Sequence, residues 1–250
     1  MSIPPATSAP PAPAIAAHLL GVVDFESCLA LQQRLVYETS GRSGGQITLL
    51  VCEHPLLVTV GRGGSRADVQ FDSGKLASHK LEVRWINRGG ATLLHAPGQL
   101  AIYPIVPLDW YGFTVGDYLA RLQAGVAGAL VEAGFQTREE PGRFGVWGRS
   151  GQLAALGVAV KSWVTYFGAY VNVCPPMQLV RHVQSDAPRS APMSSLLVQR
   201  QHGVRMAGIR ERMVRHVSLA LGTDRYHIHS GHPLLARRWP QTRETTARAG

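Results

Sequence analysis

Apolar residues recur at helical spacing and predict amphipathic helices over Asp24 to Glu38, Thr114 to Ala133 and Arg205 to Leu221. Thr114 and Asp117 resemble a capping box at the start of the second segment. The apolar faces consist of Phe25, Cys28, Leu29, Leu31 and Leu35, then Leu119, Leu122, Val126 and Leu130, and then Ile209, Met213, Val217 and Leu221. Each face predicts a helix that packs against a core.

Shorter apolar runs between these segments indicate β-strands. They cover Ile47 to Cys52, Leu56 to Val60, Glu82 to Ile86, Gln99 to Val106, Leu153 to Val160 and Trp163 to Val173. We expect the last two to pair with each other. Because strands and helices are mixed without regular alternation, we predict an α/β fold with a single domain, in which helices pack on a mixed β-sheet.

Composition changes at both ends of the chain. Residues 1 to 17 are rich in Pro, Ala and Ser and carry no charge, and residues 236 to 250 are polar and rich in Arg and Thr. Such segments bury too little surface to repay ordering, so we predict flexible tails around one domain over residues 18 to 235. The first segment also lacks the basic start and apolar centre of a signal peptide.

The composition of the 250 residues is globular, with 45% apolar and 16% charged residues, which excludes a disordered or collagen-like chain. No apolar run approaches the roughly 20 residues of a membrane helix. Three scattered cysteines predict neither a disulfide framework nor a CxxC zinc site, and they favour the cytoplasm. The net charge of +9 suits acidic partners, but the basic residues are dispersed, so we expect no nucleic-acid binding.

The stretch from Asn87 to Leu100 carries the clearest chemical signal. Arg88 can pair with an anion, and the glycines after it let the backbone approach a ligand. His95 precedes a Pro97-Gly98 turn. An isolated Arg-Gly-Gly is also typical of a plain glycine-rich turn with a solvated arginine, whereas the whole string is far more specific.

This string resembles the R-G-G-x-x-T-x-H-G-P-G-Q-L segment of the lipoyl(octanoyl) transferases, which have the biotin/lipoate protein ligase fold. Further stretches are similar to that family in the same order, and the resemblance runs from about Leu20 to about Leu221. These stretches are Leu49 to Pro55, Thr59 to Arg62, Gly145 to Trp147, Leu153 to Val158 and Thr165 to Val173.

The resemblance implies a transferase that moves an octanoyl chain from acyl carrier protein to a lysine of lipoyl domains, in 2-oxoacid dehydrogenases or the glycine cleavage protein. Family members use a cysteine that becomes a thioester and a lysine that lowers the pKa of this cysteine. The resemblance implies no metal and no cofactor. The positions that match the family's acyl-binding segments are Arg88, Gly89, Gly90, Ala91, Thr92, Leu93, Leu94, His95, Ala155, Leu156, Gly157, Gly168, Ala169 and Tyr170.

The sequence departs from the family at the chemical positions. Gln152 stands where the family has its lysine, and a count back from Ser194 without gaps places Asp186 at the cysteine. Phe167 replaces the histidine of the family's H-G pair. Asp186 could still act as a base for direct attack of a lysine on a carrier thioester. The alternative is a non-catalytic paralogue that binds lipoyl or octanoyl groups, acyl carrier protein or lipoyl domains.

Other side chains could replace the missing groups. Cys174 is a candidate nucleophile, although its apolar context predicts a buried core residue, as it does for Cys28 and Cys52. Ser185, three residues after His182, and Lys161, expected on the strand that follows Gln152, are the further candidates, and we expect both at the surface. His227, His229 and His232 have a spacing that can hold zinc or copper, but three ligands near a ragged end do not predict a metal site.

Overall fold

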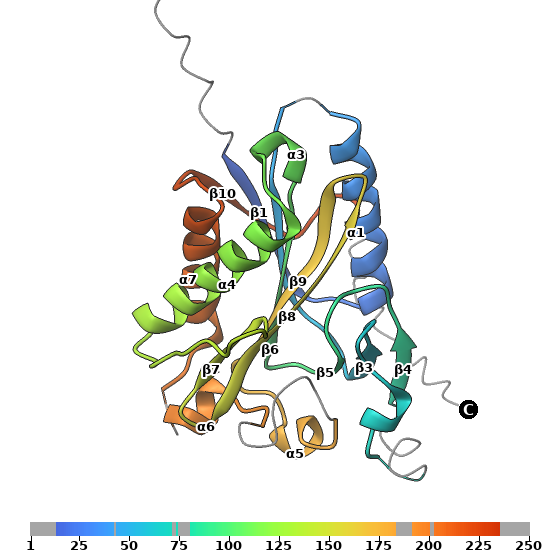
Figure 1. Cartoon of the computed structure of the whole chain (residues 1–250), viewed down its shortest axis with the longest axis vertical. Helices are drawn as coiled ribbons and strands as arrows, with labels where there is room; N and C mark the ends of the chain where they lie inside the picture. Colours follow the sequence, from blue (N-terminus) through green and yellow to red (C-terminus); the bar gives the residue numbers. More distant parts are fainter. Residues whose placement is uncertain are drawn as a thin grey trace, which may run out of the picture.

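The computed structural model describes residues 14–42, 44–71, 74, 81–183, 192–200 and 203–235. Within these ranges the main sheet has seven strands in the order β10-β1-β2-β6-β9-β8-β7. The strands are β1 (Ile15–Val22), β2 (Thr48–Glu53), β6 (Gln99–Ile105), β7 (Gly145–Gly148), β8 (Gly151–Lys161), β9 (Val164–Asn172) and β10 (Tyr226–Ser230). β1 runs parallel to β10 and β2, and the other neighbours are antiparallel, so the sheet is mixed as predicted (Figure 1).

A small second sheet stands beside the main one in the order β4-β3-β5. It consists of β3 (Leu57–Val60), β4 (Glu82–Trp85) and β5 (Thr92–His95). β3 is parallel to β4 and antiparallel to β5, and Leu57 faces His95 across that pair. β5, the strand that follows the Arg-Gly-Gly sequence, is therefore part of this small sheet.

Helices cover both faces of the main sheet, with α1 (Phe25–Ser40) on one face and α4 (Val115–Glu132) and α7 (Met206–Ala220) on the other (Figure 1). Side chains alternate along β2 accordingly. Leu49 and Val51 belong to the core with α4 and α7, whereas Leu50 and Cys52 belong to the core with α1. Short helices complete the described fold: η1 (Arg66–Asp68), α3 (Leu108–Tyr111), α5 (Met177–Val180) and α6 (Leu196–Arg200).

The long helices match their sequence predictions closely. The capping box at α4 is present, because the Thr114 hydroxyl accepts from the backbone N–H of Asp117 and the Asp117 carboxylate accepts from the N–H of Thr114. The predicted pair of strands is confirmed as β8 and β9, which are antiparallel with Val158 opposite Phe167.

Four strands, β1, β5, β7 and β10, were not predicted from the sequence. The predicted tail over residues 1 to 17 is too long, because Ile15 and Ala17 are fully buried in β1. The proline- and alanine-rich composition of the preceding residues hid this strand. Residues 236 to 250, the other predicted tail, lie outside the described residues.

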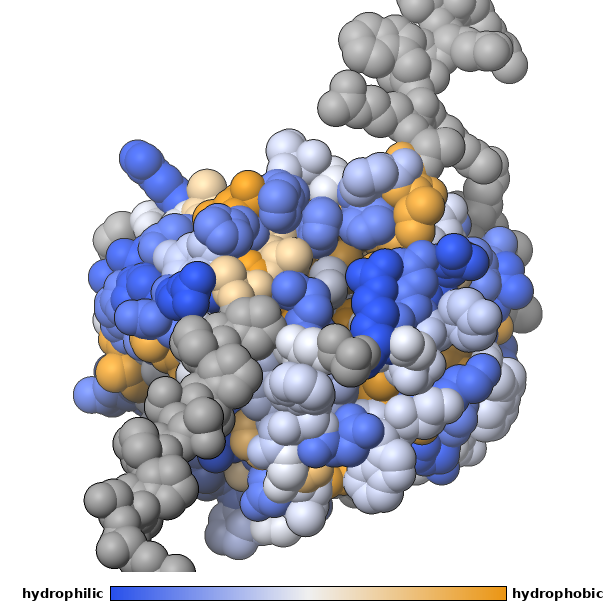
Figure 2. Space-filling model, turned by 90° about the horizontal axis from the view of Figure 1, so that it is seen from above, coloured by the Kyte–Doolittle hydropathy of each residue, from blue (hydrophilic) through white to orange (hydrophobic). Residues whose placement is uncertain are grey.

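The surface is polar over most of the face shown in Figure 2, and apolar side chains occur there in small separate groups. In the part of the chain that the structure describes, no helix has the length and apolarity needed to cross a membrane.

Candidate functional site

The Arg-Gly-Gly loop between β4 and β5 folds around its own arginine. Arg88 is fully buried, and its Nη1 donates to the carbonyl oxygens of Gly89 and Ala91, each at 2.9 Å. Its Nη2 donates to the Thr59 hydroxyl at 2.9 Å and to the Thr59 carbonyl at 3.3 Å. The guanidinium holds the loop in place, because these oxygens stabilise its charge once it is buried. The pairing of Arg88 with an anion stays a prediction.

The loop also packs closely on β8. The backbone N–H of Gly89 donates to the Val158 carbonyl at 2.8 Å. A Cβ at Gly157 would collide with the Gly89 carbonyl oxygen, so β8 needs a glycine at this point. Gly90 has a φ of +77°, a left-handed conformation that glycine adopts without strain. The glycines thus allow a close approach between the loop and β8, and the predicted approach of the loop backbone to a ligand stays a prediction.

A chain of buried hydrogen bonds leads away from Arg88 and joins the small sheet to β9. The Thr59 hydroxyl lies 2.8 Å from His95 Nε2, and His95 Nδ1 lies 2.8 Å from Gln99 Oε1. The Gln99 side-chain amide donates to the Leu94 carbonyl and to Asn172 Oδ1, both at 3.0 Å. His95 Nδ1 therefore carries the proton, and its Nε2 accepts from Thr59.

His95 is neutral in this network. Burial lowers its pKa well below the usual range, and the nearby His54 and the charge of Arg88 lower it further. The ring also packs on Tyr170, with 5.0 Å between ring centroids. His95 is thus suited to fix the geometry of its neighbours rather than to exchange protons at neutral pH.

The predicted segments on β8 and β9 lie side by side. Ala155, Leu156 and Gly157 are the register partners of Tyr170, Ala169 and Gly168. The Arg88 guanidinium carbon lies 5.5 Å from the centre of the Tyr170 ring, so the loop and this strand pair meet. The structure thus brings together the three predicted segments, namely Arg88 to His95, Ala155 to Gly157 and Gly168 to Tyr170. Their role in acyl binding stays a prediction.

Gln152, at the position of the family's lysine, is 2% exposed near the start of β8. Its backbone N–H donates to the Pro192 carbonyl at 2.9 Å, and its carbonyl accepts from Ser194 at 2.8 Å. Its side-chain Oε1 has no hydrogen-bond partner among the described residues. Asp186 and Ser185 lie outside the described residues, so the predicted proximity of Gln152 and Asp186 stays a prediction.

Phe167, at the position of the family's histidine, is buried in an unusual conformation. Its φ is +58°, a left-handed value that costs a residue with a side chain roughly 1–2 kcal/mol. The Gln32 Oε1 of α1 accepts from its backbone N–H at 2.8 Å. This hydrogen bond joins α1 to β9, and Gln32 is itself buried in the core.

The candidate substitutes are placed differently from their predictions. Cys174 is exposed and not a core residue, since it comes after the end of β9. Partial burial and the nearby Glu53 carboxylate raise the pKa of its thiol, which disfavours the thiolate. Lys161 is exposed as expected, but it ends β8 itself and so lies at the other end of the strand from Gln152.

The histidine motif near the carboxyl end acquires a partner that sequence reasoning missed. His18 of β1 stacks on His229, its register partner, at 4.9 Å, and its ring lies 4.5 Å from that of His232. Among the described residues, the ring contacts of His18 are with His229 and His232 and do not include His227. Burial lowers the pKa of both His18 and His232, so these rings are neutral near pH 7.

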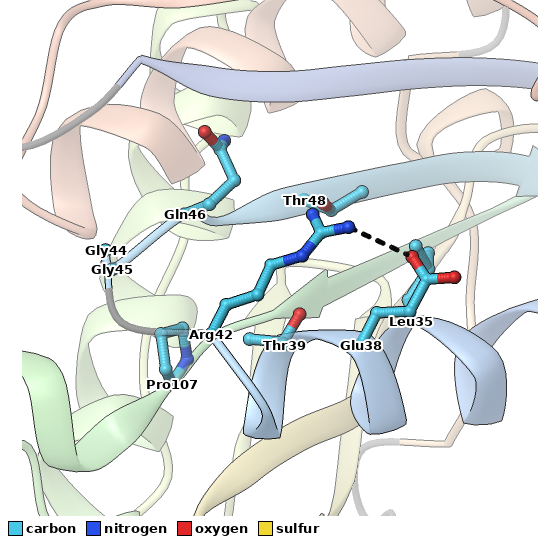
Figure 3. A pocket seen from close by; sticks show the side chains of 9 residues that line it. All are labelled: Leu35, Glu38, Thr39, Arg42, Gly44, Gly45, Gln46, Thr48 and Pro107. Carbon is cyan, nitrogen blue, oxygen red and sulfur yellow. Dashed lines mark ion pairs between the residues drawn. The ribbon is translucent and has the colours of Figure 1, made fainter.

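A pocket and a groove in the described part of the chain lie away from the predicted acyl-binding residues. Figure 3 shows a pocket of about 130 Å³ between the end of α1 and the start of β2, where the Arg42 guanidinium lies 3.8 Å from the Glu38 carboxylate. A wider groove runs along α1 and β10 past His18 and His229. Neither is lined by any residue from Arg88 to His95.

Sequence reasoning also missed Thr59, Gln99 and Asn172 as parts of the buried network. Gln99 and Asn172 stand inside the stretches that resemble the family, and this was the available signal for them. Thr59 also lies in such a stretch, because it is the first residue of the stretch from Thr59 to Arg62. These three residues lie on β3, β6 and β9, so their hydrogen-bonded contacts could be recognised only from the three-dimensional structure.

Known proteins similar to this chain include octanoyltransferases and lipoate protein ligases. The family model of the lipoyl protein ligase A/B catalytic domain matches residues 24–218. An octanoyltransferase of Geotalea uraniireducens is 35% identical over 196 residues, which cover 78% of this chain and 87% of the relative. An octanoyltransferase of Syntrophotalea carbinolica is 34% identical, and the match covers 82% of this chain and 93% of the relative.

Solved structures with the same fold are much less similar in sequence. A T. acidophilum protein solved with bound lipoic acid has a TM-score of 0.70 at 14% identity, covering 88% of this chain and 91% of that one. Lipoate-protein ligase A bound with ATP has a TM-score of 0.66 at 15% identity, with coverages of 88% and 90%. The predicted lipoate protein ligase-like fold is confirmed.

Proposed function

Because this chain belongs to the lipoyl protein ligase A/B catalytic-domain family, we propose that it transfers an octanoyl group from acyl carrier protein to a lipoyl-domain lysine. A role in lipoyl or octanoyl transfer follows from the family and from octanoyltransferase relatives at 34% and 35% identity. Lipoyl domains of 2-oxoacid dehydrogenases or of the glycine cleavage protein are the proposed acceptors. A cytoplasmic location is part of the same proposal.

The observation that carries the mechanism is the buried, uncharged Gln152 at the family's lysine position. An amide cannot supply the positive charge that stabilises a thiolate beside it. A carboxylate at residue 186 that attacked a thioester would form a mixed anhydride, which is uphill. We therefore propose transfer without a covalent acyl-enzyme at these positions.

In this mechanism the acceptor lysine nitrogen attacks the carbonyl carbon of the carrier thioester. A C–N bond forms, the C–S bond breaks, and the carrier thiolate leaves and takes up the proton that the amine loses. The protein contributes proximity and orientation, which can replace much of the missing covalent chemistry because thioesters are already activated. Asp186 is the proposed base toward the amine.

The test is intact-mass analysis of three purified proteins mixed together: this chain, octanoyl-carrier protein and a lipoyl domain. We expect the octanoyl mass on the lipoyl domain and none on this chain. A lipoyl domain whose acceptor lysine is replaced by arginine is the matched control and should stay unmodified. A thioester on this chain, mapped to Cys174 or another cysteine, would overturn the direct mechanism.

The uncharged Gln152 also favours a second function, that of a non-catalytic module that binds octanoyl or lipoyl groups or their carriers. The same mixture separates the two, because a module retains the carrier in a complex without transfer. A further variant sharpens the result. Asp186→Cys combined with Gln152→Lys should restore covalent capture on this chain if both positions correspond to those of the family.

A further inference from the structure

Two cysteines and a histidine that lie far from Gln152 form a compact buried group. Cys28 belongs to α1, Cys52 to β2, and His54 follows β2 directly. Their side chains are at most 1% exposed. The two Sγ atoms are 3.9 Å apart, and Cys52 Sγ lies 3.6 Å from His54 Nε2. All three potential ligand atoms lie within 4.8 Å of one another.

The Cys28–Cys52 and Cys52–His54 separations match those of ligands around one tetrahedral zinc ion. Zn–S bonds of about 2.3 Å and Zn–N bonds of about 2.0–2.1 Å place two sulfurs about 3.8 Å apart, and a sulfur and a nitrogen about 3.6 Å apart. The group differs in this respect from His18, His229 and His232, which stack ring on ring.

The histidine is held in the form that a metal needs. His54 Nδ1 lies 2.8 Å from the Val23 carbonyl, so this nitrogen donates its proton and leaves a lone pair on Nε2. Metal-bound histidines characteristically use their other nitrogen in this way. Burial lowers the pKa of His54 to about 4, so the ring is neutral across the physiological range.

The charges of the group also suit a divalent ion. Burial and the neighbouring Cys28 thiol raise the pKa of Cys52, so its sulfur is protonated in the absence of a metal. Zinc displaces two thiol protons into solvent, and the two thiolates then balance its charge. The product is a neutral unit, which avoids the cost of an uncompensated charge in the core.

We propose that Cys28, Cys52 and His54 bind one zinc ion. In the absence of the ion the Tyr103 hydroxyl donates to His54 Nε2 at 2.8 Å, and the ion takes the place of this hydrogen bond. The ion joins α1 to β2 behind the predicted acyl-binding residues, because the Tyr103 ring packs 5.8 Å from that of Tyr170. Its role is structural, and it fixes the helix whose Gln32 holds Phe167.

The test is a cobalt titration of the full chain after removal of metal by a chelator under reducing conditions. Cobalt bound to thiolates gives an intense near-ultraviolet charge-transfer band, and tetrahedral geometry gives strong visible bands. We expect both to saturate at one cobalt per chain, and we expect zinc to displace the cobalt.

Variants assign the signal to the cluster. Cys28→Ala and Cys52→Ala should each abolish tight cobalt binding, whereas the matched control Cys174→Ala, which removes the exposed cysteine, should leave it unchanged. Circular dichroism verifies folding, and Cys28→Ser serves as a second variant if Cys28→Ala unfolds. Absence of a thiolate band in the wild-type chain would overturn the proposal, as would a band that persists in a folded Cys28 variant.

Discussion

The two faces of the main sheet are packed by different chemistry. Toward α4 and α7 the core is almost entirely aliphatic, with residues such as Leu122 and Val217. Toward α1 and the small sheet the core contains neutral histidines, tyrosine hydroxyls, thiols and a buried arginine. Buried polar groups are costly unless they are paired. The α1 face pairs most of them in two groups of hydrogen bonds, one from Thr59 to Asn172 and one around His54. The contrast separates a mainly apolar face from a more polar face that carries most of the predicted acyl-binding residues.

The largest effect on stability is expected for Leu122→Ala in α4, which tests the difference between the two faces. Leu122 is fully buried, so the change should lower the free energy of unfolding by about 2–5 kcal/mol. Urea unfolding measures the loss. Binding of octanoyl-carrier protein should stay unchanged under conditions in which the variant is folded. Weaker binding by the folded variant would show that the two faces are coupled.

Acid should destabilise the α1 face selectively. The pKa of His54 is about 4 in the folded protein and near 6.5 in the unfolded chain, so the unfolded chain binds more protons between these values. The stability contributed by neutral His54 is complete above about pH 6.5 and is lost as the pH falls toward 4. At pH 5 the loss is about 2 kcal/mol.

Urea unfolding of the metal-free protein at pH 7 and pH 5 measures this effect. His54→Gln removes the titrating group and should flatten the dependence on pH. An unchanged slope in a folded His54→Gln protein would assign the acid sensitivity to other groups, of which His95 is the next, since its pKa is also lowered.

Thr59→Val tests the network itself. The change keeps the shape of the side chain but removes the hydroxyl that accepts from Arg88 and donates to His95. It should cost about 1–3 kcal/mol, because buried polar atoms lose a partner, and it should weaken binding of the octanoyl carrier. Thr48→Val on β2 is the matched control and should alter neither quantity by more than about 0.5 kcal/mol.

The smallest effect is expected at the start of α4. Thr114→Ala removes the capping box on the exposed start of the helix and should cost about 1 kcal/mol. Thermal unfolding measures the loss, and octanoyl-carrier binding should not change. A binding defect as large as that of Thr59→Val would contradict the division between the two faces.

The same contrast determines how far the sequence could be interpreted. α4 and α7 were predictable because one apolar stripe facing one core repeats at helical spacing. β10 was not, because its side chains beyond Tyr226 are exposed and only Ile228 among them is apolar, so no buried face marks the strand. β1 was hidden by the proline-rich composition that precedes it.

At the site, the segments were predictable and their contacts were not. The string from Arg88 to His95 predicted an approach of the backbone to a ligand, whereas its hydrogen bond from Gly89 to Val158 of β8 was not predicted. The burial of Arg88 was not foreseeable, because its acceptors include Thr59 from another strand. The meeting of Cys28 with Cys52 likewise depends on α1 docking on β2. The exposure of Cys174 was mispredicted because its apolar neighbours continue past the end of β9.

The parallel pairing of β1 with β10 has a consequence for synthesis on the ribosome. Ile15 is among the earliest described residues to be made, yet its partner on one side is Tyr226. Pairs so distant in sequence form late, because the whole intervening chain must first be available. The inner strands and α1 can therefore assemble while one edge of β1 is still open. An open strand edge is a site of unwanted pairing with other chains, so nascent chains of this protein are expected to need protection until β10 emerges.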